Sequence, residues 1–287
     1  MARHKILTFT VMYFIQAWIL GLDSKMVSLP LYDPKSSMSL DMAPDSVDDS
    51  YKGCEDKMFR KVLDLYLPKE RQKNKDFNQA WTAAEDHYKE KGKLSKYYSL
   101  AYIQVYVNAT ANVYRSFNNA TRTQKENYTT TFQYHSLHFL LTNALRILNN
   151  NFWKRFIKKH FHTFRGTNVT FHHDGKTTMR FGQFTLSSLD KRIAKGFGTK
   201  SCFEIATYFG APLGKYSQLP HEKEVLIPPY EVFKITKVMK RTDKKDFWCD
   251  VVYKLQRTKK GKSDLNCHMV KRIKSNQQHK FSAFNQI

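Results

Sequence analysis

Two glutamates separated by a single residue are the strongest candidates for chemistry in this sequence. Glu222 and Glu224 flank Lys223, and an apolar run over 225–227 follows them before two prolines. Residues two apart in an extended segment face the same way, so we expect both carboxylates on one face and Lys223 on the other. Paired carboxylates can stabilise a developing cation and handle a proton. On spacing alone, a solvated charged loop explains the same residues.

Two earlier segments could complete a site around these glutamates. Arg165 stands beside Gly166, and an arginine next to a glycine at a strand end can clamp a phosphate while the glycine backbone comes close to a ligand. The stretch 180–184 leads into hydroxyl residues that include Ser187 and Ser188. Such hydroxyls can orient a ligand or a catalytic carboxylate.

Helices in the first half of the chain and strands in the second must position these residues. Apolar spacing predicts helices over 54–66, 76–90 and 132–149, the last one ended by an asparagine run at 149–151. Runs of Val, Ile, Phe and Thr predict strands over 178–184, 202–208, 224–227 and 247–255. Helices first and sheet second predict an α+β fold, with a mainly helical subdomain followed by a β-sandwich-like core.

The first 22 residues have the pattern of a secretory signal peptide. A basic start precedes about 15 apolar residues, fewer than the roughly 20 that a membrane-spanning helix needs. An uncleaved membrane anchor is the alternative. After it we expect an extended lead-in and helical subdomain over 23–160, a β-rich core over 161–270 and a basic tail over 271–287.

Glycosylation sequons and cysteines agree with secretion. Sequons begin at Asn108, Asn119, Asn127 and Asn168. The four cysteines are an even number, which suits an oxidising compartment, and counting alone leaves three possible pairings. No hydrophobic tail follows the basic C-terminus, so we expect a soluble, secreted monomer.

The sequence carries a formal net charge of +23. A field of this sign attracts sulfated sugars, anionic cell surfaces and acidic proteins. A secreted protein has little occasion to meet nucleic acid, so we expect no specific nucleic-acid partner. Paired histidines at 160, 162, 172 and 173 lack the further spacing of a zinc site, and we expect no metal.

The order of the motifs resembles the vertebrate ecto-ADP-ribosyltransferases. That family carries an Arg–Ser–Glu-x-Glu signature on an NAD-binding core, and the resemblance runs from about Leu40 to about Cys267. It implies an arginine-specific mono-ADP-ribosyltransferase that uses NAD or NADP as substrate, acts on arginine-bearing extracellular proteins and hydrolyses NAD as a side activity.

The resemblance also implies residue roles. Arg165 would contact the NAD phosphates and Gly166 would offer backbone atoms to the nicotinamide amide. Glu224 would stabilise the oxocarbenium-like state, and Glu222 would position the acceptor guanidinium and help remove its proton. The cofactor-shell candidates are Tyr106, Gln183 and Ser217.

The chain departs from the family pattern at two places. Leu186 stands where the family usually has the serine that hydrogen-bonds the catalytic glutamate, so a serine such as Ser187 must take over or activity is reduced. The resemblance pairs Cys54 with Cys267. A second family bridge has lost both members, at His160 and Tyr208, leaving Cys202 and Cys249 either as a replacement bridge or as two buried thiols. A weakened enzyme that acts as a basic glycosaminoglycan- or cell-surface-binding protein is the alternative function.

Overall fold

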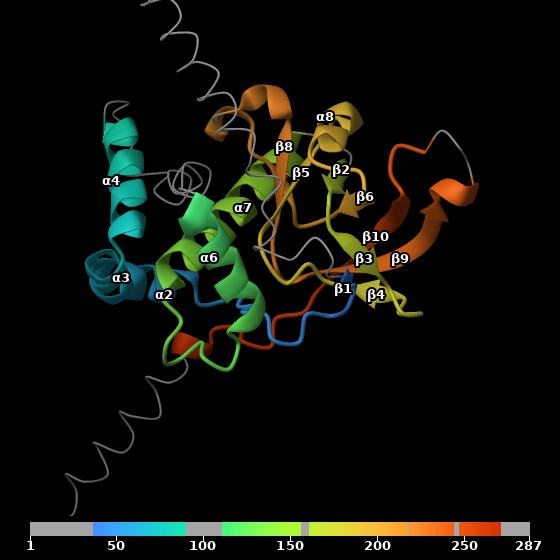
Figure 1. Cartoon of the computed structure of the whole chain (residues 1–287). Helices are drawn as coiled ribbons and strands as arrows, with labels where there is room; N and C mark the ends of the chain where they lie inside the picture. The colour runs from blue at the N-terminus through green and yellow to red at the C-terminus, as the bar shows by residue number, and fades with distance from the viewer. Residues whose placement is uncertain (1–36, 90–110, 156–160, 218, 244–246, 271–287) are drawn as a thin grey trace, which may run out of the picture.

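The computed structural model describes residues 37–89, 111–155, 161–217, 219–243 and 247–270. Helices occupy the first part and strands the second, which confirms the α+β fold (Figure 1). The helices of the first part are α2 (Glu55–Lys61), η1 (Val62–Tyr66), α3 (Leu67–Lys73), α4 (Lys75–Lys89), α6 (Ala111–Thr123) and α7 (His135–Arg155). None of the described helices is long and apolar enough to cross a membrane.

Helix α2 runs through η1, a turn of π-helix, into α3. Pro68 stands in the first turn of α3, where it has no N–H to donate to the carbonyl four residues earlier. The backbone takes the wider turn just before this proline, which keeps the helical path continuous.

Helix α7 continues through the asparagine run to Arg155, so the predicted stop at 149–151 is wrong. The amide of Asn149 donates to the carbonyl oxygens of Tyr208 and Gly210, at 2.9 and 2.8 Å. This side chain therefore ties the helix to the strand-rich part instead of competing for the helix backbone. At the other end, the Glu70 carboxylate accepts the N–H groups of His135 and Ser136 and caps α7.

Eight strands form one hydrogen-bonded sheet in the order β4-β9-β10-β6-β2-β5-β8-β7. Their bounds are β2 (Phe161–Thr167), β4 (Thr178–Met179), β5 (Thr185–Ser188), β6 (Ser201–Thr207), β7 (Ala211–Pro212), β8 (Glu224–Ile227), β9 (Glu231–Lys240) and β10 (Val251–Gly261). β1 (Ser37–Ser39) and β3 (Thr170–His172) pair separately. The strand predicted over 178–184 is confined to β4. Short helical segments α8 (Lys191–Gly196), η2 (Gly214–Tyr216), η3 (Pro220–Glu222) and η4 (Arg241–Asp243) join the strands.

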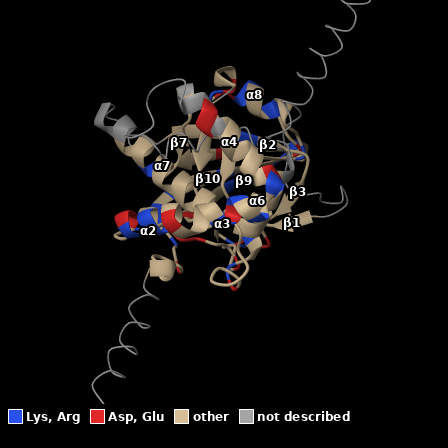
Figure 2. Cartoon of the chain, turned by 90° about the vertical axis from the view of Figure 1, so that its left-hand side faces the viewer, with Lys and Arg blue, Asp and Glu red and all other residues tan. Residues whose placement is uncertain are grey.

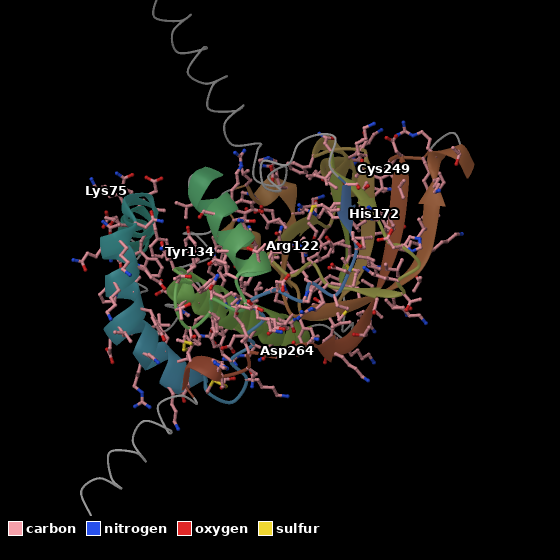
Figure 3. The ribbon with its side chains drawn as sticks, turned by 60° about the horizontal axis from the view of Figure 1, so that its bottom comes forward. Lys75, Arg122, Tyr134, His172, Cys249 and Asp264 are labelled. Carbon is pink, nitrogen blue, oxygen red and sulfur yellow. A yellow bond between two sulfur atoms is a disulfide. The ribbon has the colours of Figure 1, made fainter. Side chains whose placement is uncertain are left out.

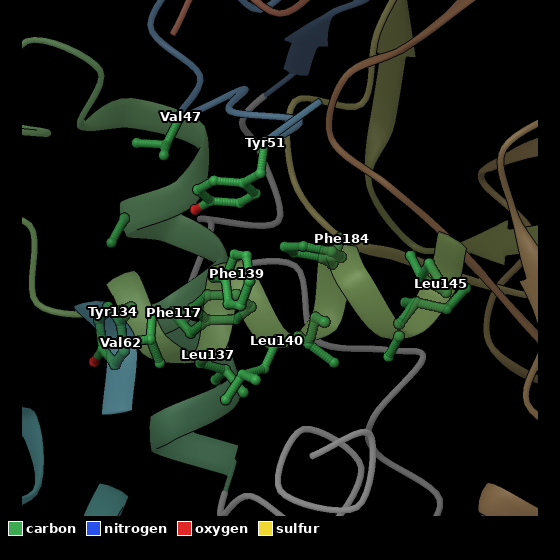
Figure 4. Close-up of a cluster of buried hydrophobic side chains, with 14 of the residues drawn as sticks. Val47, Tyr51, Val62, Phe117, Tyr134, Leu137, Phe139, Leu140, Leu145 and Phe184 are labelled. Carbon is green, nitrogen blue, oxygen red and sulfur yellow. The ribbon is translucent and has the colours of Figure 1, made fainter. Parts of the chain in front are cut away.

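The two faces of the sheet bury different clusters. Leu186 and Leu226 pack with the helices in the largest cluster, where Phe184 stacks on Phe117 (Figure 4). The other face brings Ile227 of β8 together with Phe233 of β9, so strands far apart in the sheet order share one core. This folding of the sheet onto itself agrees with the sandwich-like arrangement expected from the sequence.

The segment directly before α2 is largely buried. Asp48 forms a fully buried ion pair with Arg180 at 2.8 Å. Asp49 accepts hydrogen bonds from the backbone of Tyr51 and Cys267 and from the Tyr128 hydroxyl. Burial raises the pKa of Asp49 to about 6, although these donors oppose the rise. The segment therefore connects the start of the described chain to its end.

Two disulfides close the fold. Cys54 is bonded to Cys267, 213 residues away, and the Cys267 N–H is one of the donors to Asp49. Cys202 is bonded to Cys249 across 47 residues, and Figure 3 marks Cys249 on the strand-rich side. The loop-entropy model gives stabilisations of about 5 and about 4 kcal/mol for closures of these lengths.

Candidate active site

Glu224 begins β8, a strand whose four residues are all buried. Glu222 is also buried, but it ends the short helix η3, and Lys223 between them is in the left-handed region at φ 50°. The expectation of one extended Glu-Lys-Glu segment is therefore wrong, because the turn at Lys223 separates the helical residue from the strand residue. Their burial also excludes the solvated charged loop. The site therefore contains two buried glutamates that belong to different elements.

Ser217 holds the Glu224 carboxylate. Its hydroxyl donates a hydrogen bond to one Glu224 oxygen and accepts the N–H of Leu219 at 2.9 Å. The Leu213 N–H donates to the Glu224 backbone carbonyl at 2.9 Å, so the turn that carries Ser217 is fastened to β8 at two points. A serine from outside the sheet therefore orients this carboxylate.

The β5 strand places its hydroxyls differently from the expectation. Leu186 is fully buried in the cluster under the helices, and Ser187 donates to the Val225 carbonyl at 3.1 Å on the opposite face of the sheet from Glu224. Ser188 lies directly opposite Glu224, but its hydroxyl donates to the Glu222 carbonyl at 2.6 Å. The structure thus brings Ser188 to the pair of glutamates and does not bring Ser187 there.

Arg165 lies on the sheet face opposite to Glu224, as the pairing of β2, β5 and β8 shows. Its buried guanidinium donates to the Leu186 carbonyl at 2.6 Å. A small gap in front of it is lined by residues that include Arg122, Arg180 and Gln183, and Figure 3 marks Arg122 on α6. The amide oxygen of Gln183 is buried there and has no hydrogen-bond partner among the described residues.

Gly166 is pressed against α8 and the turn that follows it. A Cβ atom at this position would lie 2.2 Å from the Ala194 carbonyl oxygen and 2.4 Å from that of Gly198. Only a glycine allows the two backbones to approach this closely. α8 is thereby set beside β2, and its N-cap residue Asp190 donates its N–H to the Ser188 hydroxyl at 3.0 Å.

A cluster of charges forms the rim of the site. Asp190 accepts from Arg192 at 2.9 Å and from Lys223 at 3.2 Å. These donors hold the pKa of the Asp190 carboxyl well below its usual value. The pairing fixes the turn at Lys223 and leaves the Arg192 guanidinium largely exposed. Asp190 was not singled out in the sequence, and no helix was predicted over α8, although an aspartate is a favoured helix N-cap residue.

Two predicted residues, Tyr106 and Asn108, lie outside the described residues. Of the predicted glycosylation positions, Asn119, Asn127 and Asn168 are exposed. Among the described residues, no group of three or more His, Cys, Asp or Glu side chains could hold a metal ion.

The chain belongs to the NAD:arginine ADP-ribosyltransferase family, whose model matches residues 40–254. This confirms the resemblance seen in the sequence. It is 35% identical to the Bos taurus ecto-ADP-ribosyltransferase 5 over 229 residues, covering 74% of this chain and 71% of that protein. It is also 35% identical to the Gallus gallus erythroblast NAD(P)(+)--arginine ADP-ribosyltransferase over 211 residues, covering 71% of this chain and 69% of that protein.

Solved structures give the same result. A mutant of the eukaryotic mono-ADP-ribosyltransferase ART2.2, solved in complex with NAD, matches with a TM-score of 0.65 and 32% identity. The match covers 80% of this chain and 98% of that one. A second ART2.2 mutant, in complex with NADH, matches with a TM-score of 0.63 and 31% identity over the same shares. NAD is the substrate that this family uses.

Proposed function

We propose that this protein transfers ADP-ribose from NAD to arginine side chains of extracellular proteins. The observation that carries the proposal is the pair of buried glutamates, of which Glu224 is oriented by Ser217. Cleavage of the bond between nicotinamide and ribose builds positive charge on the sugar. A fixed carboxylate in an enclosed site stabilises that charge without reorganising, which lowers the barrier.

In this proposal the two glutamates have separate tasks. Glu224 stabilises the oxocarbenium-like ribose as nicotinamide leaves. Glu222 accepts hydrogen bonds from the acceptor guanidinium and takes its proton as the arginine nitrogen attacks the sugar carbon. When water replaces arginine, the same site hydrolyses NAD. Ser217 is the serine that supports Glu224, so the leucine at 186 does not leave the carboxylate without an orienting hydroxyl.

The other predicted cofactor contacts belong to the same proposal. Arg165 and Gln183 line one gap together with Arg122, a setting suited to a diphosphate. Gly166 presents backbone next to α8. The register sets Arg165 and Glu224 on opposite faces of the sheet where β2 meets β5. Contact with both residues therefore requires NAD to extend from one face to the other at this point.

We also propose secretion. The two disulfides and the exposed sequon residues at 119, 127 and 168 support an oxidising, extracellular compartment. N-terminal sequencing of protein recovered from culture medium tests it: a mature start near 21–25 is expected, and an intact N-terminus favours the anchored alternative.

The activity is tested by incubating the purified protein with NAD and a soluble arginine analogue, following ADP-ribosylated analogue and free nicotinamide separately. Both products are expected. Nicotinamide alone would mean an NAD glycohydrolase. Neither product, together with retention on heparin above ordinary salt, would favour the alternative of a binding protein that uses its positive charge.

A further inference from the structure

Side chains from six neighbouring strands form one cross-strand row that starts at Glu224. Each member of the row lies directly opposite the next, and directly opposed residues share a face of the sheet. The row runs Glu224, Ser188, Phe164, Glu204, Lys254, Lys237 and crosses β8, β5, β2, β6, β10 and β9. The glutamate of the proposed reaction is therefore on the same face as the lysines of the outer strands.

The far end of this row is basic and exposed. Lys237 and Lys254 are directly opposite each other, an arrangement of like charges that destabilises a sheet. Lys234 is also exposed and lies opposite Gln256, which is two residues after Lys254 on β10 and therefore on the same face. Among the residues that the structure describes, neither Lys234 nor Lys237 forms an ion pair. Within the described part of the chain, both charges are therefore available to an anionic partner.

A residue from α8 extends the basic surface toward the site. Lys191 lies over the rings of Phe164 and Trp248 and contacts Glu204 at 3.1 Å. Lys254 contacts the other oxygen of Glu204 at 3.3 Å. We call Lys191, Lys234, Lys237 and Lys254 the lysine face. Its charge differs from that of α2 on the helical side of the molecule, where acidic residues in the first turn are followed by basic residues in the last (Figure 2).

The lysine face is hollowed rather than flat. A solvent-open pocket beside the row is lined by residues that include His162, Ala206, Gln256 and Arg257. A concave basic surface can hold a length of extended chain as well as a single ion.

We propose that the lysine face docks an acidic segment of the acceptor protein and so selects which arginines are modified. This inference rests on the proposed function. Five strand spacings of about 4.8 Å separate Glu224 from Lys237, or about 24 Å. An extended chain covers that distance in about seven residues. The preferred acceptor therefore carries acidic side chains about seven residues from the target arginine.

A polypeptide fits this face better than a sulfated polysaccharide. Glu204 stands in the middle of the row and pairs with Lys191 and Lys254, so the row alternates in charge before it reaches Lys237. An acceptor segment can place neutral or basic residues over Glu204 and acidic residues over Lys234 and Lys237. Such a segment would also lie on the sheet face that carries Glu224.

The test uses two fluorescent peptides with one arginine each, one carrying a run of glutamates about seven residues away and the other carrying glutamines instead. Binding to the full chain is measured by anisotropy without NAD, and transfer is measured with NAD. The variant Lys234→Glu/Lys237→Glu reverses the charge of two exposed residues on β9. The matched control is Lys57→Glu/Lys69→Glu, which makes the same change in net charge on α2 and α3. Lys234→Gln/Lys237→Gln serves if the reversal impairs folding.

The wild type should bind the glutamate peptide about tenfold more tightly than the glutamine peptide, a preference that salt screens. The β9 variant should lose this preference and the control should keep it. Equal binding of both peptides to the wild type, or equal loss in the control, overturns the proposal. It is also overturned if the β9 variant loses heparin retention but keeps its peptide preference. Transfer to the soluble arginine analogue reports separately on the proposed function.

Discussion

The Ser217 hydroxyl donates a hydrogen bond to the Glu224 carboxylate from a turn seven residues earlier in the chain. The same oxygen accepts the Leu219 N–H, so the hydroxyl hydrogen is directed at the carboxylate. The turn itself is fixed because Leu213 donates to the backbone of Glu224. In the proposed function, this hydroxyl supports Glu224 in place of the β5 serine that the family pattern leads one to expect at position 186.

We predict that Ser217→Ala lowers kcat/KM for arginine transfer roughly ten- to hundredfold, because hydrogen bonds to charged groups are worth about 1.5–3 kcal/mol. Ser187→Ala is the matched comparison. Its hydroxyl bonds a backbone carbonyl on the other face, so we expect a loss of about 1 kcal/mol in unfolding free energy and a smaller effect on transfer. A larger kinetic effect at position 187 than at 217 would show that NAD binding rearranges β5.

We predict that Glu224→Gln abolishes both transfer and NAD hydrolysis, since the charge that stabilises the sugar cation is removed. Glu222→Gln should abolish transfer to the arginine analogue but retain NAD hydrolysis. In the proposal Glu222 binds the acceptor guanidinium and takes its proton, and attack by water depends less on these two tasks. Separate assays of nicotinamide and ADP-ribosylated analogue check this. Normal transfer by both variants would refute the site assignment.

The contact between Gly166 and α8 gives a steric prediction. Gly166→Ala should destabilise the protein by about 1–3 kcal/mol and impair transfer, because its Cβ would collide with two carbonyl oxygens that cannot move independently. Gly196→Ala in α8 is the control: a Cβ there meets nothing within 4 Å, so stability should be unchanged or slightly higher. Thermal unfolding of both variants decides it, and equal melting temperatures would count against the proposed fit of α8.

Glu70 gives a pH prediction. Burial raises its pKa to about 8, although the His135 and Ser136 N–H groups donate to it. A carboxyl whose pKa is higher in the folded than in the unfolded chain contributes stability below pH about 4.5, and this is lost as the pH rises toward 8. Glu70→Gln remains neutral, so it should gain unfolding free energy relative to the wild type over this range. Urea unfolding at several pH values measures the difference, and a constant difference would contradict the expectation.

Several elements around the candidate site could be predicted from the sequence because they depend on short stretches of neighbouring residues. The apolar run after Glu224 specifies a buried strand, and the structure places β8 over those residues. Periodicity located α4 at 75–89 within one residue of the expected 76–90. The family resemblance also singled out the two glutamates as candidates, and Ser217 as a candidate of the cofactor shell. These features depend on side-chain patterns a few residues long, which a single sequence displays.

Other features depend on contacts between residues far apart in the chain. The left-handed turn at Lys223 is held by Asp190, which lies 33 residues earlier, so alternation alone wrongly extended the strand to Glu222. The asparagines after 148 suggested a helix end, but Asn149 bonds to the carbonyls after β6 and α7 continues. In both cases a long-range hydrogen bond outweighed the local preference.

The sequence by itself determined the α+β class, the family, the two candidate carboxylates and the pairing expected for Cys54 and Cys267. Only the tertiary structure decided which serine supports Glu224, that Cys202 and Cys249 are joined, and that Arg165 faces away from Glu224. It also decided that Lys237 and Glu224 share one face across six strands. The reason is that the strand order β9-β10-β6-β2-β5-β8 differs from the order along the chain. Local patterns specify which residues form strands, whereas the neighbours of each strand are fixed when the sheet assembles around its buried faces.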